Sequence, residues 1–141
     1  KEAIKIKRVT DDQIVSSAYM LGDSISQALK DTIQAAANDL CNLPDLTTYL
    51  ANDQLQELIS QASIRCHQEQ ITHPKEVEIW EAYQAGFIQK SPLQAGIQRL
   101  GDKNNYKELV FTVPLTYTEG ESNKLAVLSI TLKKSAIIMT F

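Results

Sequence analysis

The sequence is poor in the residues that carry most recognisable chemistry. Among its 141 residues it has two cysteines, two histidines and one tryptophan, and the cysteines do not form a CxxC pair. None of its five glycines belongs to a phosphate-binding loop, so nucleotide binding through a familiar loop is not expected. No apolar run approaches the roughly 20 residues that a membrane-spanning helix needs. The net charge of −3 argues against a general nucleic-acid binder, which would carry a basic field.

What is present is the composition of an ordinary soluble domain. Hydrophobic residues make up 43% of the chain and charged residues 22%. A chain of 141 residues fits one domain with one real core, so residues 1–141 are expected to fold as a single unit. Because the chain begins at Lys1 and not at Met, we expect a processed protein or a domain excised from a longer chain.

The strongest structural signal is a β-hairpin over residues 108–132, around which the rest of the chain is organised. Hydrophobic and other side chains alternate on both sides of a turn that contains Gly120, which is typical of two paired strands. One strand face carries Leu109, Phe111, Val113, Leu115 and Tyr117. The opposite face is rich in threonine and serine, and three interpretations fit it: solvent exposure, the floor of a polar ligand pocket, or an edge that recruits another strand. Thr112 and Thr116 are the candidate ligand or partner contacts there, and interleaved valines and leucines indicate partial cover.

A long amphipathic helix is predicted from Asp11 to about Cys41. Thr10 and Gln13 have the spacing of a capping box, and two acids follow the cap. An apolar stripe recurs at helical spacing along this segment, and Gly22 is a candidate bend. Such a stripe usually packs in the core of its own chain. This one is also long enough to pair with the same helix of a second chain across a dimer interface. The stripe that would form the dimer contact consists of Ile14, Leu21, Ile25, Leu29 and Ile33.

The middle of the chain is predicted to be mostly helical. Helical patterns cover residues 46–50, 53–66, 75–89 and 91–100, although the third segment also passes for part of a strand. Residues 1–9 are predicted to form a short edge strand, or alternatively a basic arm beside a membrane. Residues 136–141 are predicted to form a third strand or the start of a truncated element. The expected fold class is α+β: a long N-terminal helix and shorter helices packed on a small antiparallel sheet.

The best cluster of reactive side chains lies in the middle of the chain. Cys66, His67, His73 and Glu78 could form a small catalytic centre, and with Glu76 a zinc site, but their spacing fits no established ligand pattern. Free, buried and inert thiols are the expected state of Cys41 and Cys66, with a disulfide as the alternative. No catalytic residue, metal or cofactor is therefore assigned. Three aromatic residues close to this cluster are further candidates for ligand or partner contact: Trp80, Tyr83 and Phe87.

Two stretches resemble parts of known sensory and secretion domains. Residues 33–58, with a Leu-Pro-Asp-Leu turn after a long helix, resemble the entry to a Cache-type sensor domain. Val113-Pro114-Leu115 followed by residues 125–132 resembles the closing strands of such a sensor, and equally those of bacterial secretion scaffolds. Residues 67–105 lack the strands and glycine turns that a Cache-type domain implies, so no family is assigned.

These observations favour a non-catalytic sensory or interaction domain of a larger bacterial protein. It would bind a small ligand or a protein partner and signal through its long helix, or dimerise by it. The alternatives are a scaffold subunit of a secretion system or other assembly, and a small enzyme that uses Cys66, His67, His73 or Glu78. We expect no nucleic-acid partner, and a membrane contact only through a segment outside these residues. Cytoplasmic location is slightly favoured, and an extracytoplasmic one would follow from a Cys41–Cys66 disulfide.

Overall fold

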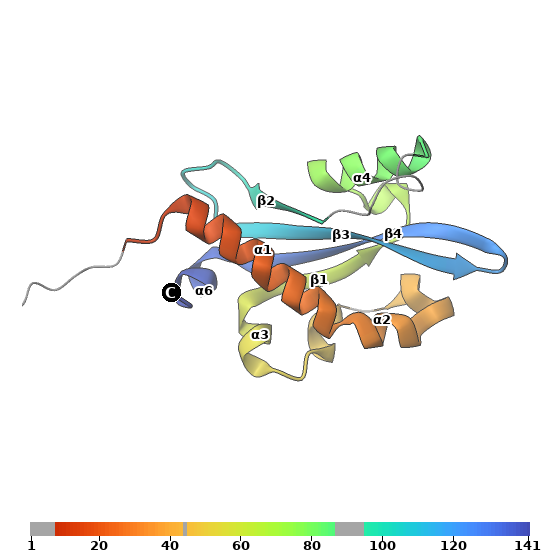
Figure 1. The fold of residues 1–141 in the computed structure, drawn as a ribbon, viewed down its shortest axis with the longest axis horizontal. Coiled ribbons are helices and arrows are strands. Elements are labelled where there is room, and N and C mark those ends of the chain that lie inside the picture. Colours follow the sequence, from red (N-terminus) through yellow and green to blue (C-terminus); the bar gives the residue numbers. More distant parts are fainter. Residues whose placement is uncertain (1–7, 44, 87–94) are drawn as a thin grey trace, which may run out of the picture.

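A computed structural model describes residues 8–43, 45–86 and 95–141, and in these ranges the chain is an α+β fold in three layers (Figure 1). Helix α1 (Asp11–Ala28) crosses one face of an antiparallel sheet, and α4 (Pro74–Gln84) covers the other. The remaining helical elements are short: α2 (Lys30–Ala36), α3 (Asp53–Leu58), α6 (Lys134–Ile138), and the 3-10 turns η1 (Ala37–Asn42), η2 (Leu46–Tyr49) and η3 (Gln68–Gln70). No helix in the described ranges is both long and apolar enough to cross a membrane.

The predicted C-terminal hairpin is confirmed, and it forms the centre of the sheet. Strands β3 (Glu108–Glu119) and β4 (Ser122–Lys133) pair along their whole length, with Gly120 at a positive φ of 64° in the two-residue turn. Two shorter strands flank the hairpin in the order β1-β4-β3-β2: β1 (Ile59–Arg65) pairs with β4, and β2 (Gly96–Leu100) pairs with β3. The hairpin therefore supplies both inner strands of the sheet.

Helix α1 begins and packs much as the sequence predicts. Thr10 and Gln13 form the capping box, with the Gln13 N–H 3.2 Å from Thr10 Oγ1. The apolar stripe faces the sheet of its own chain, where Ile25 and Leu29 are fully buried. Helix α1 continues through Gly22, which lies directly against the Phe111 side chain: a Cβ there would lie 2.4 Å from Phe111 Cγ. The predicted continuous helix is interrupted instead at Leu29, between α1 and α2.

Two predicted helices are wrong, because strand pairing overrides their local sequence. The helix expected over 53–66 ends at Leu58, and the chain continues as the edge strand β1. The helix expected over 91–100 is wrong over its described part, since residues 96–100 form β2 beside β3. Both segments have apolar spacings that fit either structure, and the neighbouring strand supplies the backbone partners that decide between them.

Three smaller predictions can be compared with the structure only in part. The chain after β4 forms the short helix α6 and not a third strand of the C-terminal region. The helical interpretation of 75–89 is confirmed for α4, which ends at Gln84, whereas Phe87 lies outside the described residues. The edge strand expected within residues 1–9 also falls largely outside them, since the description begins at Arg8.

Candidate functional site

The candidate site is the layer between α4 and the sheet, which we call the α4 layer. It contains a small apolar cluster in which Ile79 of α4 packs on Leu125 and Val127 of β4, flanked by Trp80 and Tyr83. Tyr83 also donates a hydrogen bond to the Asn123 carbonyl oxygen, 3.3 Å away. Beside this cluster lies a polar one that is centred on Glu76.

Glu76 is a carboxylate with no exposed surface, held by three neighbours. Ser129 Oγ on β4 donates to Glu76 Oε2 at 3.1 Å, and the His73 backbone N–H donates to Oε1 at 3.2 Å. The Arg65 guanidinium on β1 forms an ion pair with it, with 3.5 Å between Nε and Oε2. His73 Nε2 lies further off, 3.9 Å from Oε1. A buried carboxylate needs such partners, because an isolated one is strongly destabilising.

The strands place a row of hydroxyl groups beneath Glu76. Ser63 of β1, Ser129 of β4 and Thr112 of β3 are direct cross-strand neighbours, and all three project toward α4. Thr112 has no exposed surface and Ser129 is 3% exposed. The interpretation of this face as solvent-exposed is therefore wrong at its centre. It holds only near the hairpin tip, where Thr116 is exposed.

The α4 layer also contains polar atoms whose hydrogen bonds are not satisfied. In ranges 8–43, 45–86 and 95–141, the buried side-chain atoms without a hydrogen-bond partner are Ser63 Oγ, Arg65 Nε, Trp80 Nε1 and Thr112 Oγ1. All four belong to this layer, and each is, or can be, a hydrogen-bond donor. Native proteins leave few buried polar groups unpaired, so these four atoms distinguish the α4 layer from the rest of the described protein. Arg65 Nε is the least isolated of them, since it lies 3.5 Å from Glu76 Oε2.

A second candidate feature is a groove on the opposite side of the hairpin, between the end of α1, α2 and β3. It encloses about 350 Å³. Its apolar floor comes from Ile33, Leu115 and Leu128, and its rim includes Lys30 and Thr116. We call this the β3 groove.

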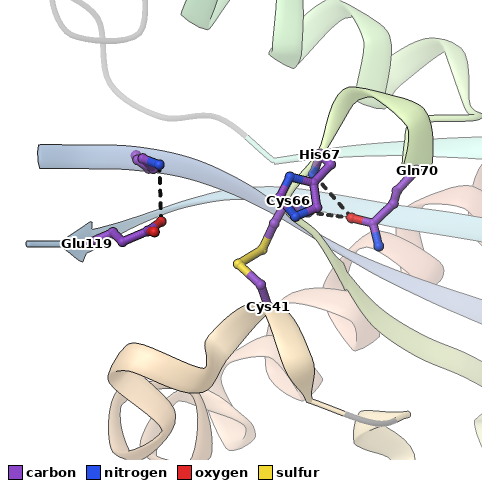
Figure 2. The surroundings of a disulfide bond; sticks show 6 residues. Cys41, Cys66, His67, Gln70 and Glu119 are labelled. Carbon is purple, nitrogen blue, oxygen red and sulfur yellow. Dashed lines mark hydrogen bonds and ion pairs between the residues drawn. A yellow bond between two sulfur atoms is a disulfide. The ribbon is translucent and has the colours of Figure 1, made fainter.

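The two cysteines form a disulfide, so the expectation of free thiols is wrong. Figure 2 shows Cys41 of η1 joined to Cys66 at the end of β1, across a sequence separation of 25 residues. Their Cα atoms lie 5.8 Å apart, within the usual range for a bridge. Gln70 holds the chain that follows, because its Oε1 accepts from the N–H groups of Cys66 and His67 at 2.9 and 3.1 Å (Figure 2).

The structure separates the residues of the predicted catalytic cluster. Cys66 is oxidised and belongs to the core on the α1 side, while His67 is exposed in the following turn. Glu78 lies on the outer side of α4 and pairs with Lys75 at 3.4 Å. Only His73 of the four reaches the α4 layer. The described ranges contain no group of three or more His, Cys, Asp or Glu side chains arranged to hold a metal ion.

The predicted ligand contacts fall in two places. Trp80, Tyr83 and Thr112 meet in the α4 layer, and Thr116 lines the β3 groove. Of the predicted dimer stripe, Ile14, Ile25 and Leu29 are buried against the sheet of the same chain, and Leu21 and Ile33 are partly buried beside them. Dimerisation through this stripe stays a prediction. Arg65 and Ser63 are not among the predicted contacts, because their segment is predicted to be a helix and forms β1 instead. Glu76 is predicted only as a minor member of the zinc cluster, although its place three residues after His73 marks it as a capping residue.

Comparisons with protein-family models, with curated proteins and with solved structures find no match to this chain.

Proposed function

We propose that this chain is a non-catalytic sensory or interaction domain that binds a small, oxygen-rich ligand in the α4 layer. One observation carries the proposal: the unsatisfied buried donors of the described residues gather in this layer and nowhere else in those residues. Leaving a buried donor unpaired costs about 1–3 kcal/mol, so a molecule that supplies acceptors there gains binding free energy.

The chemistry of the layer defines the class of ligand. Thr112 Oγ1 and Trp80 Nε1 require acceptor atoms, such as carboxylate or carbonyl oxygens. The adjacent side chains of Ile79, Leu125 and Val127 are apolar, so the rest of such a ligand would be apolar or aromatic. A small organic acid with a short aliphatic or aromatic portion meets both requirements. Glu76 already balances Arg65, so a strongly charged ligand such as a phosphate is less suitable.

The sheet offers a short route from this layer to the long helix. Thr112 faces α4, and Phe111, the preceding residue on β3, faces the other way and touches Gly22 of α1. A ligand that shifts Thr112 therefore acts on the strand that supports α1. The proposed signal is a change in how α1 packs on the sheet.

The single tryptophan makes the proposal directly testable. Trp80 is the only tryptophan in the chain, so tryptophan fluorescence, excited selectively over that of the five tyrosines, reports on the α4 layer alone. The probes would be a series of monocarboxylates from acetate to phenylacetate, titrated at fixed pH and ionic strength. We expect a saturable change in Trp80 fluorescence with at least one probe, and native mass spectrometry of the same sample should show the bound mass.

A matched pair of variants separates specific binding from a general solvent effect. Thr112→Val removes the buried hydroxyl and keeps the shape, and should weaken binding about tenfold or more. Thr116→Val makes the same change on the exposed part of the same strand and should leave binding unchanged. An unaltered titration with Thr112→Val, or no saturable response to any probe, would contradict the proposal.

The disulfide supports a location in an oxidising compartment, such as the bacterial cell envelope. Disulfides persist in such compartments and are rare in reducing cytosol. Protein isolated without reductant and then denatured should have a mass lower by the two hydrogens that the Cys41–Cys66 bridge removes. Two free thiols in protein taken from its native compartment would argue for a cytoplasmic location.

The second candidate function is that of a structural subunit of a protein assembly. The β3 groove favours this alternative, because it lies on the face of the hairpin opposite the α4 layer. A protein partner that binds equally well to Thr112→Val and to the unmodified chain, without any small molecule, would support it over the sensory function.

A further inference from the structure

The β3 groove forms where the helices on the α1 side pack less closely on the hairpin. Helix α1 is tightly packed up to its end, since Ile25 and Leu29 have no exposed surface. The helix is interrupted at Leu29, and α2, which follows, contains no buried residue. The groove of about 350 Å³ lies between this part of the helical layer and the hairpin.

The floor of the groove is apolar and only partly covered by the protein itself. Ile33 of α2 and Val113 and Leu115 of β3 line the groove and are only partly buried against the core. Leu128 of β4 also contributes to the floor. Removing apolar surface from water is favourable in proportion to its area, so an aliphatic chain that lies on this floor gains binding free energy.

The rim of the groove is polar and carries one positive charge. Ser26 and Gln27 of α1 and Gln34 of α2 contribute hydroxyl and amide groups, and Lys30 contributes an ammonium group. Lys30 is exposed and takes part in none of the ion pairs of the described ranges. The described residues that line the groove include no aspartate or glutamate. An apolar floor with a single cation at its rim is complementary to an apolar chain that ends in one anionic group.

We propose that the β3 groove binds a free, single-chain aliphatic carboxylate such as octanoate. The aliphatic chain lies on the floor, and the carboxylate pairs with Lys30 at the rim. The volume of the groove falls within the range of about 300–1,000 Å³ that is usual for small-molecule pockets. A stable protein interface buries about 800 Å² on each partner, so a hollow of this size suits a small ligand better than a protein surface.

Methyl NMR can detect binding in the groove separately from binding in the α4 layer. The unmodified chain would be titrated with butanoate, hexanoate and octanoate, each below its micelle concentration. We expect saturable shifts of the Ile33 and Leu115 methyl signals, with an affinity that rises about fourfold for each additional buried methylene group. The Ile79 methyl signals report on the α4 layer, so the two sites give independent answers.

A reversal of charge at Lys30 tests recognition of the carboxylate. Lys30→Glu changes an exposed residue, and Lys103→Glu makes the same change at an exposed residue in the loop between β2 and β3, away from the groove. We expect Lys30→Glu to weaken octanoate binding about tenfold and to strengthen the binding of octylamine, which has a cationic group on the same chain. Lys103→Glu is the matched control and should bind both probes as the unmodified chain does.

Either of two results would overturn the proposal. The first is the absence of saturable shifts at Ile33 and Leu115 with all three carboxylates, and a response confined to Ile79 would count as this result while leaving binding in the α4 layer intact. The second is octanoate binding in the groove that Lys30→Glu does not weaken, in a variant whose circular dichroism shows an intact fold. The groove would then recognise an apolar chain without regard to its charge.

Discussion

The two faces of the sheet differ in what they bury. On the α1 side, the buried sheet residues are apolar, as with Leu109, Phe111, Leu128 and Ile130. On the α4 side, apolar residues alternate with a carboxylate and hydroxyl groups. In the described ranges, the polar or charged residues that are buried all lie on the α4 side: Glu76, Thr112 and Ser129. The α1 side of the sheet is thus a purely apolar packing surface. The α4 side also buries polar side chains, which lowers the stability of the fold.

This difference separates the residues that folding explains from those that folding does not explain. A well-packed apolar face needs no explanation beyond folding, because burial of its side chains drives the fold. Buried polar groups that are only partly satisfied require another reason. Phe111 and Thr112 are neighbours on β3 but face opposite sides of the sheet, so substitutions at these two residues test the two faces separately.

The largest effect is expected for Phe111→Ala on the α1 side. Phe111 is fully buried, its ring lies 5.4 Å from that of Tyr19 in an edge-on arrangement, and it fills the space above Gly22. Its loss should lower the free energy of unfolding by about 3–5 kcal/mol, a large part of a typical total of about 5–15 kcal/mol. Urea unfolding followed by circular dichroism measures this. A loss below about 1 kcal/mol would mean that this face is not the main core.

The sequence predicts the apolar face well, and the reason is physical. The alternation in the hairpin and the helical spacing in α1 each arise because one face of the element is buried. Each pattern lies within a single segment, so the sequence of that segment is enough to predict it. The capping box at Thr10 is equally local and is confirmed. The α4 side is different, because Arg65 and Glu76 come from segments far from the hairpin that carries Thr112 and Ser129. The hairpin pattern places Thr112 and Ser129 on one face, but nothing in it indicates Arg65 or Glu76.

The wrong predictions share this cause. Ala62, Ile64 and Cys66 alternate as a strand, yet Ile59, Ala62 and Cys66 also fit a helix, and only pairing with β4 decides. The state of the two thiols is likewise a tertiary property, since Cys41 and Cys66 meet only when η1 packs beside the end of β1. Local patterns predicted which residues are buried better than they predicted which elements those residues form.

A smaller loss is expected for Glu76→Ala on the α4 side. The substitution leaves Arg65 and Ser129 without their carboxylate partner. We expect the free energy of unfolding to fall by about 2 kcal/mol, less than for a fully buried pair because Arg65 retains contact with water. Loss of α4 packing should also raise the accessibility of Trp80 to acrylamide. If Glu76→Ala destabilises the chain as much as Phe111→Ala, the two faces do not differ as proposed.

Asp11, Arg99 and Tyr106 form a polar cluster at the rim of the α1 side. This cluster makes the stability of the fold depend on pH. The hydrogen bond from Arg99, reinforced by one from Tyr106, lowers the pKa of Asp11 below its usual value. The charged carboxylate therefore stabilises the fold fully above about pH 4, where Asp is ionised in the unfolded chain. This contribution is lost as the pH falls through the lowered pKa of the folded state.

Asp11→Asn should remove that part of the acid sensitivity. Urea unfolding at intervals between pH 2 and pH 6 should show a smaller fall in stability below about pH 4 for the variant than for the unmodified chain. Asp12→Asn is the control, since Asp12 shares the first turn of α1 but lacks the Arg99 and Tyr106 contacts. Identical pH profiles for Asp11→Asn and the unmodified chain would show that the cluster contributes nothing to the fold.

The smallest effect on stability, and the most informative, is expected for Thr112→Val. Thr112 follows Phe111 directly but faces α4, and its hydroxyl is buried without a partner in the described ranges. Replacing an unpaired hydroxyl with a methyl group of similar shape should leave the free energy of unfolding unchanged or raise it by up to about 1 kcal/mol. A clear loss of stability would mean that the hydroxyl is bonded in the folded protein, and that this face is satisfied without a ligand. Unchanged or higher stability, together with weakened carboxylate binding, would show that Thr112 serves recognition and not folding.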